Sequence, residues 1–303
     1  MTSSPSLSRR QFGTLAGVGA IAAMLRAQVE AADKAAGAVG MGKVKHSVCK
    51  WCYKQIPLEE FCVAAKEIGL ESVELLNPED FATVKKHGLH CAMVSYPTIE
   101  APGGVKLGPI PKGWNRTEHH DLLVQAYEPL LKTSAEAGFK QVICFSGNRD
   151  GMDDAQGLEN CAKGLTRLMP LCEKLGVTLV MELLNSKVNH PDYMCDHSAW
   201  GVGLCKKIGS PHFKLLYDIY HMQIMEGDVI ATIKRDHEYF AHYHTGGVPG
   251  RAEIDETQEL YYPAIIKAIQ ETGYTGYLGQ EFIPKREDKI ASLKQGVQIC
   301  TVA

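Results

Sequence analysis

Short apolar runs separated by amphipathic segments make up most of the chain. The most continuous run, residues 179–185 (Leu-Val-Met-Glu-Leu-Leu-Asn), is typical of a buried strand and carries one carboxylate, Glu182. Three later apolar runs also end in a side chain that can bind a metal ion, and these side chains belong to Asp218, His244 and Glu281. A charge at the end of a buried strand is costly unless it has a partner, so the pattern predicts one shared site for the four residues.

The alternation of apolar runs and amphipathic segments predicts eight strand–helix repeats, which is typical of a parallel sheet wrapped by helices. Strands are expected at residues 43–49, 72–76, 89–95, 141–145, 179–185, 215–218, 240–244 and 276–281. Helices are expected at residues 57–68, 78–87, 117–137, 153–175, 199–208, 228–238, 261–272 and 286–300. Because no linker interrupts the alternation, we expect residues 43–303 to form a single α/β domain, a (β/α)8 barrel with its site at the C-terminal ends of the strands. The Pro/Gly-rich residues 96–115 are expected to form a structureless loop that covers this site.

The first 42 residues do not follow this pattern. Arg9 and Arg10 precede a short apolar run rich in Gly and Ala, at residues 15–25, and small residues follow it. This order is typical of a secretory signal, and the paired arginines indicate the twin-arginine export machinery. We therefore expect residues 1–42 to be a signal peptide and linker, and the mature protein to be exported to the periplasm. The apolar run is too short to anchor the mature protein in a bilayer.

Replacement of both Arg9 and Arg10 by lysine should abolish export, because the export machinery recognises the paired arginines. N-terminal sequencing of exported wild-type protein should place the first mature residue between Ala27 and Gly42. Export of the double-lysine variant at the wild-type level would contradict the prediction.

Composition and charge narrow the possible functions. The 303 residues are 45% hydrophobic and 22% charged, which is typical of a globular chain with one large core. The formal net charge of -3 gives no electrostatic reason to expect a nucleic-acid partner. The ten cysteines are scattered, apart from the pair Cys49 and Cys52, and we expect buried, reduced side chains rather than a disulfide framework. Assembly of several copies of the chain is compatible with this composition.

The predicted site combines three carboxylates with one imidazole. Each residue alone could instead cap a helix or be a hydrogen-bonded core residue, but their coincidence at four strand ends favours metal binding. Such an oxygen-rich set suits a hard or borderline divalent ion, so we expect Mn²⁺ or Mg²⁺, with Co²⁺ or Zn²⁺ as alternatives. A structural zinc site would contain more cysteine and histidine. The candidate metal ligands are Glu182, Asp218, His244 and Glu281.

Other residues lie where a substrate would bind. His221 follows Asp218 by three residues and can donate a hydrogen bond to a substrate oxygen, or alternatively cap a helix. The guanidinium of Arg251 can bind a carboxylate or a pair of hydroxyls, or remain solvated in a loop. Trp114 in the long loop and Asn185 at the end of its apolar run are further candidates for substrate contact.

Four segments carry a family resemblance, and they are Met-Glu-Leu-Leu-Asn at 181–185, Tyr-Asp-Ile-Tyr-His-Met-Gln at 217–223, His-Tyr-His-Thr-Gly-Gly-Val-Pro-Gly-Arg at 242–251 and Gly-Gln-Glu-Phe-Ile-Pro at 279–284. Together they resemble the hydroxypyruvate isomerase branch of the xylose isomerase-like barrel superfamily, over essentially all of residues 43–303. The resemblance implies a xylose isomerase-like TIM barrel with a divalent metal at the four candidate ligands. It also implies proton transfer by the two glutamates and substrate contacts from His221 and Arg251. Ketose 3-epimerases of the same superfamily resemble this chain in having histidine at the position of His244, where hydroxypyruvate isomerases have glutamine.

The resemblance implies a metal-dependent isomerase that moves a proton through an enediolate of a small hydroxy-ketone, keto-acid or sugar. Return of the proton to the neighbouring carbon is isomerisation, and return to the other face of the same carbon is epimerisation. Loss of a β-substituent instead would make the protein a sugar lyase or dehydratase, and the ligand set is compatible with all three reactions. A non-catalytic exported sugar-binding protein is a further alternative, but such a protein has no need for two glutamates at the metal.

Overall fold

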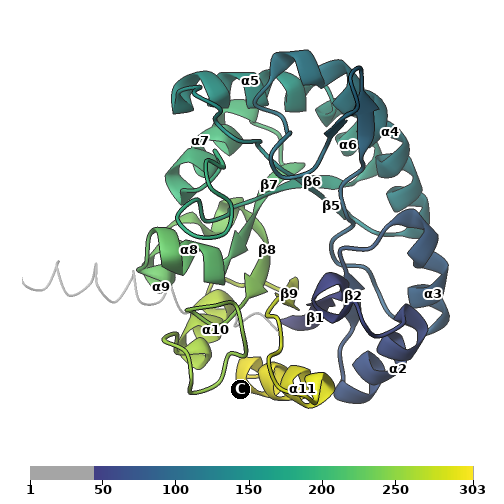
Figure 1. Ribbon diagram of the computed structural model, residues 1–303, viewed down its shortest axis with the longest axis vertical. Helices are drawn as coiled ribbons and strands as arrows, with labels where there is room; N and C mark the ends of the chain where they lie inside the picture. The colour runs from purple at the N-terminus through teal and green to yellow at the C-terminus, as the bar shows by residue number, and fades with distance from the viewer. Residues whose placement is uncertain (1–43, 303) are drawn as a thin grey trace, which may run out of the picture. The chain divides into compact units, whose positions relative to one another are not determined.

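A parallel sheet curled inside a ring of helices forms the part of the chain that the computed structural model describes, residues 44–302 (Figure 1). Seven strands pair in the order β2-β1-β9-β8-β7-β6-β5, and every pair is parallel. The strands are β1 Lys45–Cys49, β2 Ser72–Glu74, β5 Gln141–Cys144, β6 Thr178–Glu182, β7 Phe213–Asp218, β8 Phe240–Thr245 and β9 Tyr277–Gln280, with a separate antiparallel pair of β3 Ile99–Ala101 and β4 Val105–Leu107. The α/β TIM barrel fold predicted from the sequence is confirmed.

The expected strand at residues 89–95 is the position where the sheet is incomplete. Within this segment Val94 makes isolated parallel bridges to Leu76 on one side and to Val142 on the other. These bridges connect the β2 edge to the β5 edge, so single contacts rather than a full strand close the ring. β2 ends early because Leu75 has a φ of 58°, a left-handed conformation that interrupts an extended ladder. An extended segment in the expected place thus replaces the predicted regular strand.

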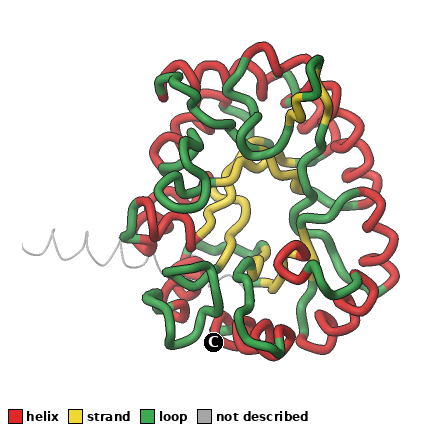
Figure 2. The backbone as a smooth tube through the Cα atoms, viewed as in Figure 1, coloured by secondary structure: helices red, strands yellow, loops and turns green. Residues whose placement is uncertain are grey.

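Helices lie outside the strands (Figures 1 and 2). They are α2 Leu58–Ile68, α3 Phe81–Lys86, α4 His120–Ala137, α5 Asp154–Thr166, α6 Met169–Leu175, α7 Ser198–Ile208, α8 Ile219–Met225, α9 Val229–Asp236, α10 Tyr262–Glu271 and α11 Lys289–Cys300, with 3-10 turns η1 Lys50–Tyr53, η2 Pro78–Asp80, η3 Thr117–His119 and η4 His237–Tyr239. The single helix expected at residues 153–175 is divided into α5 and α6, because Pro170 lies in the first turn of α6 and has no backbone N–H to donate. Helix α8 was not expected, and the carboxylate of Asp218 caps it by accepting the backbone N–H of His221 at 3.1 Å.

The long loop at residues 96–115 is more ordered than expected, since it contains the β3–β4 hairpin. At the C-terminal end of the loop, the backbone N–H of Trp114 donates to the carbonyl oxygen of Phe145 at 3.2 Å. A β-carbon at Gly113 would lie 2.0 Å from the same carbonyl oxygen, so this close approach requires glycine. The loop is therefore fixed against the end of β5.

Strand β6 illustrates why the apolar runs form the barrel. Leu179, Val180 and Met181 are fully buried, because a parallel strand in a barrel packs against side chains on both of its faces. Glu182 is the last residue of the strand and is 4% exposed. The apolar residues thus hold the strand in the core and place the carboxylate at its C-terminal end.

The predicted signal segment, residues 1–42, lies outside the described residues. Among the helices of residues 44–302, none combines the length and the apolar character needed to cross a membrane. All ten cysteines are buried free thiols, in agreement with the expectation from their scattered positions.

Candidate metal centre

The four candidate ligands converge at the C-terminal ends of neighbouring strands. Glu182 ends β6, Asp218 ends β7, His244 is the penultimate residue of β8, and Glu281 directly follows β9. One donor atom from each side chain lies within 4.8 Å of the donor atoms of the other three. Asp218 and His244 are fully buried, and Glu182 and Glu281 are almost fully buried. The structure therefore brings together the four residues that the strand pattern grouped.

Two basic side chains compensate the three carboxylates. Nδ1 of His244 lies 2.8 Å from Oε2 of Glu281 and 3.6 Å from Oε1 of Glu182. Nη2 of Arg251 lies 2.5 Å from Oε2 of Glu281 and 3.3 Å from Oδ2 of Asp218. Because buried charges need partners, these contacts allow several carboxylates to lie close together in the core.

The two glutamates differ in their tendency to bind a proton. Burial raises the pKa of Glu182, and the neighbouring carboxylate of Glu281 raises it further. Burial would also raise the pKa of Glu281, but Arg251 and His244 hold that pKa well below its usual range. Glu281 is therefore a fixed carboxylate, whereas Glu182 accepts a proton more readily.

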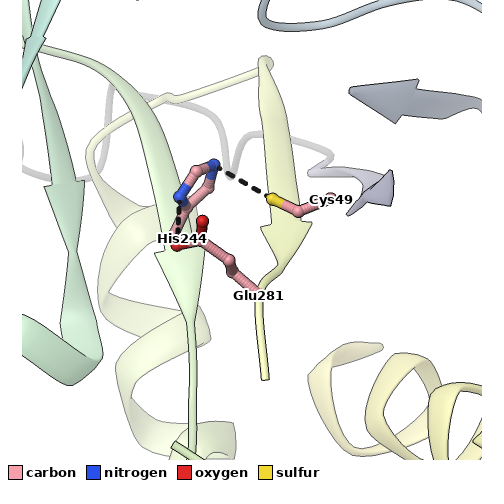
Figure 3. Close-up of side chains that lie close together, drawn as sticks. All are labelled: Cys49, His244 and Glu281. Atoms are coloured by element: carbon pink, nitrogen blue, oxygen red, sulfur yellow. Dashed lines mark hydrogen bonds and ion pairs between the residues drawn. The ribbon is translucent and has the colours of Figure 1, made fainter. Parts of the chain in front are cut away.

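The surroundings of His244 favour the protonated form of its imidazole in the metal-free protein. Figure 3 shows the ring between the thiol of Cys49, whose sulfur lies 3.6 Å from Nε2, and the carboxylate of Glu281. Burial alone would lower the pKa of His244, but the Cys49 sulfur and the Glu281 carboxylate raise it well above its usual range. The imidazolium thus stabilises the carboxylates when no metal ion is bound.

Metal binding should release about one proton near neutral pH, because an ion at Nδ1 of His244 displaces the proton held there. The direction of the pH dependence follows from the raised pKa of His244. The apparent affinity for the metal ion should increase as the pH rises towards that pKa and level off above it. Calorimetric titration with Mn²⁺ in buffers of different ionisation enthalpy counts the released protons. An affinity that stays constant from about pH 6 to 8, the range in which histidine ordinarily titrates, would contradict this prediction.

The donor set fits a divalent ion. Ligand atoms on opposite sides of an ion with bonds of about 2.1 Å lie about 4.2 Å apart. The donor atoms of the cluster already lie within 4.8 Å of one another, so only small shifts would bring them to bonding distance. In addition, Oε1 of Glu182 is buried and has no hydrogen-bond partner in the described part of the chain, and a metal ion would remove the cost of that arrangement.

A cavity of about 350 Å³ borders the cluster. Glu182 and Glu281 line it, whereas the fully buried Asp218 and His244 do not. The other lining residues are Trp51, Lys54, Leu75, Ser95, Tyr96, Ile110, Ile143, Phe145, Leu184, His190 and Arg251. The two glutamates, of which Glu182 accepts a proton more readily, thus face the space available to a substrate.

His221 and Asn185 form a hydrogen-bonded pair beside the cluster. Nδ1 of His221 accepts the backbone N–H of Asn185 at 3.1 Å and lies 2.6 Å from its side-chain nitrogen. Burial, together with Arg251, keeps the pKa of His221 well below its usual range, so the ring is neutral with its proton on Nε2. Nε2 lies 3.7 Å from Oδ2 of Asp218 and has no hydrogen-bond partner within residues 44–302. His221 therefore has a free donor and Asn185 orients its ring, but both side chains are fully buried and neither lines the cavity.

Trp114, expected to contact substrate, lies away from the cavity. Its side chain is 1% exposed, and its ring packs 5.4 Å from the ring of Tyr127 and 6.0 Å from that of His120. The backbone contact of Trp114 with the end of β5 directs the ring towards α4, which carries both neighbours. The loop therefore contributes other residues, Tyr96 and Ile110, to the cavity wall.

Trp51 belongs to the site although the strand pattern did not identify it. Its indole N–H donates to Oε1 of Glu281 at 2.7 Å, and its ring centre lies 5.2 Å from the guanidinium carbon of Arg251. Tyr220 faces the same guanidinium at 5.3 Å. Trp51 lies in η1, directly after β1, so the rule that functional residues follow barrel strands could have identified it.

Comparison with known proteins gives a consistent family match. Residues 62–300 match the protein family described as Xylose isomerase-like TIM barrel. The crystal structure of an AP endonuclease, family 2, from Brucella melitensis superposes with a TM-score of 0.74 at 24% identity, covers 84% of this chain and 99% of that chain, and shows the same fold.

Several relatives are named 2-oxo-tetronate isomerase, and two of them show the range of similarity. The protein from Cupriavidus necator is 37% identical over 110 residues, which is 36% of this chain and 42% of that protein. The protein from Haemophilus influenzae is 24% identical over 242 residues, which is 78% of this chain and 91% of that protein. The more similar alignment thus spans less than half the length of its relative.

Proposed function

Because the chain belongs to the xylose isomerase-like TIM barrel family, we propose that it is a metal-dependent isomerase of a small hydroxy-ketone, keto-acid or sugar. The reaction moves a proton between adjacent carbons through an enediolate. The observation that carries this proposal is that Glu182 and Glu281, alone among the four ligands, line the cavity. A site that only binds a sugar has no need for a carboxylate of raised pKa beside the metal.

The chemistry is divided between the bound ion and the chain. A divalent ion held by Glu182, Asp218, His244 and Glu281 supplies Lewis-acid stabilisation of negative charge on a ketone oxygen and an adjacent hydroxyl oxygen. Glu182, whose pKa is raised, removes the proton from the carbon that bears this hydroxyl, next to the ketone carbon. Glu182 then returns the same proton to the neighbouring carbon, while Glu281 stays ionised as a metal ligand. Asp218 and His244 lie away from the cavity and keep the other two ligands in place.

His221 and Arg251 orient the substrate in this proposal. The unpartnered Nε2–H of His221 donates to a substrate oxygen that reaches the cluster. The guanidinium of Arg251 lies between the rings of Trp51 and Tyr220, which restrict its movement while its N–H groups face the cavity and the carboxylates. Both side chains also screen the negative charge that develops on the substrate during proton removal.

Isomerisation is the first candidate reaction and epimerisation the second. The 2-oxo-tetronate isomerase relatives support isomerisation of a small keto-acid. His244 favours epimerisation, because the chain resembles the ketose 3-epimerases at this position. Proton removal is the same in both reactions, and they differ in the carbon or face to which the proton returns.

Deuterium exchange tests the proposal. The full chain loaded with Mn²⁺ should be incubated in D₂O with hydroxypyruvate, a 2-oxo-tetronate, a ketopentose or a ketohexose. Proton NMR of the recovered compounds should show deuterium next to the carbonyl of at least one compound, and the product distinguishes isomerisation from epimerisation. Absence of exchange with every compound, by protein shown to contain metal, would overturn the proposal.

A further inference from the structure

We propose that Glu74 is a positioning residue of the metal centre, which fixes the ring of His244 so that Nδ1 is its metal-binding nitrogen. The proposal rests on the metal-dependent function above, but concerns a residue outside the four ligands. Glu74 is the last residue of β2 and is fully buried. Its Oε1 lies 2.7 Å from Nε2 of His244.

The contact joins strands that are not neighbours. In the sheet order, β1 and β9 lie between β2, which carries Glu74, and β8, which carries His244. The carboxylate therefore reaches across the interior of the barrel rather than along a strand pair. A buried carboxylate in a barrel interior is costly without partners, so its place there requires a specific interaction.

The intervening strands leave room for this carboxylate. On β9, a β-carbon added to Gly279 would lie 2.6 Å from Oε1 of Glu74 and 2.8 Å from Cδ2 of His244. On β1, the sulfur of Cys49 lies 3.6 Å from both Oε1 of Glu74 and Nε2 of His244. Glycine at position 279 is thus required for the contact between the carboxylate and the imidazole.

A second imidazole holds the carboxylate in position. Nε2 of His242 lies 2.8 Å from the same Oε1 of Glu74. His242 and His244 are two residues apart on β8, so both side chains point into the barrel. The carboxylate is therefore held from one strand by two rings, of which only His244 reaches the three other ligands.

The contact determines which nitrogen of His244 can bind a metal. An ionised carboxylate only accepts hydrogen bonds, so Nε2 of His244 must carry a proton and donate to Glu74. Nδ1 is then the available nitrogen, and it faces Glu281 at 2.8 Å and Glu182 at 3.6 Å. A carboxylate behind a ligating histidine also increases the basicity of the ring and its affinity for metal.

Titration of the full chain with Mn²⁺ alone tests the proposal through metal affinity. Glu74→Ala should weaken Mn²⁺ binding by about 10- to 100-fold, the usual effect of losing such a partner. Glu74→Gln should weaken it less, because the amide oxygen can still accept the Nε2–H but supplies no charge. The matched control is Asp196→Asn, a buried carboxylate that contacts Arg149 and Ser186 but none of the metal ligands.

Two outcomes of the titration would overturn the proposal. One is wild-type affinity in both Glu74 variants. The other is an equal loss in Asp196→Asn, which would indicate general destabilisation rather than a specific effect on His244. Absence of isomerase activity in the wild-type protein would refute the proposed function but leave these comparisons valid, because the measured quantity is Mn²⁺ binding.

Nitrogen NMR of the wild-type protein tests the same proposal without a variant at Glu74. In ¹⁵N-histidine-labelled protein loaded with Mg²⁺, the His244 ring should show a protonated Nε2 and an unprotonated Nδ1. The signals are assigned by their loss in His244→Gln. A protonated Nδ1 with a bare Nε2 in the loaded protein would overturn the proposal even if the Glu74 variants do not fold.

Discussion

Replacement of Glu182 by glutamine should lower kcat by about 10² to 10⁴, the range expected for loss of a general acid–base group. Glutamine keeps an oxygen that can contact a metal ion but cannot remove a proton at neutral pH. Glu182 lines the cavity, its pKa is raised by burial, and its Oε1 has no hydrogen-bond partner among the residues that the structure describes. Metal content should therefore fall far less than turnover, which metal analysis and kinetics on the same sample would show.

Glu281→Gln should differ from Glu182→Gln in a measurable way. Glu281 binds Trp51, Arg251 and His244, which hold it as an ionised carboxylate. Its replacement should therefore reduce metal affinity together with turnover. Glu173→Gln is the control, since the exposed Glu173 side chain is hydrogen-bonded to Ser210 and not to any metal ligand among the described residues, and it should leave both quantities unchanged. Normal turnover in Glu182→Gln would indicate that another group moves the proton.

The four candidate ligands could be predicted from the sequence because their positions follow from simple geometry. In a parallel barrel all C-terminal strand ends meet at one mouth, so polar side chains at the ends of apolar runs must lie close together. Asp218 and His244 are even paired directly in the β7–β8 register. The prediction therefore required only the strand ends and the handedness of the βαβ repeat, both of which are local properties of the chain.

The contribution of Glu74 could not be predicted in this way. It lies in a short strand, and its partner His244 is separated from it by two strands in the sheet and 170 residues in the sequence. Their contact depends on the absence of a side chain at Gly279, a third position that no periodic pattern connects with the first two. Contacts across a barrel interior depend on the complete packing arrangement rather than on any single segment.

The difference between the predicted and the observed position of Trp114 has a similar cause. A loop of about twenty residues can approach the sheet in many ways, and sequence alone does not determine which face of the loop packs inward. Here the approach of Gly113 to the carbonyl of Phe145 fixes the backbone and directs the indole into the helical layer. The glycine was visible in the sequence, but its contact partner was not.

Asp218→Asn should abolish most of the stabilisation that metal binding gives to the fold. Asp218 is fully buried, and its Oδ2 lies 3.3 Å from Arg251, while its Oδ1 caps α8 through the backbone N–H of His221. Asparagine keeps the capping oxygen and removes the charge that attracts the ion. With metal at 100 times its Kd, binding stabilises the folded state by about 2.7 kcal/mol, and a hundredfold loss of affinity would leave about 0.4 kcal/mol.

The metal-free form of the same variant provides the control that separates metal binding from folding. Burial raises the pKa of Asp218 well above its usual range despite the opposing effect of Arg251, so its charge at neutral pH destabilises the metal-free fold. Removal of that charge should leave the Tm of the metal-free protein unchanged or higher, whereas the increase in Tm on addition of Mn²⁺ should nearly disappear. Thermal unfolding of both proteins with and without Mn²⁺ measures the two effects separately. If Asp218→Asn keeps the wild-type metal content and the full Mn²⁺-induced increase in Tm, Asp218 is not a ligand. If the Tm of the variant without metal is lower than that of the wild type, the charge of Asp218 stabilises the fold through Arg251 instead.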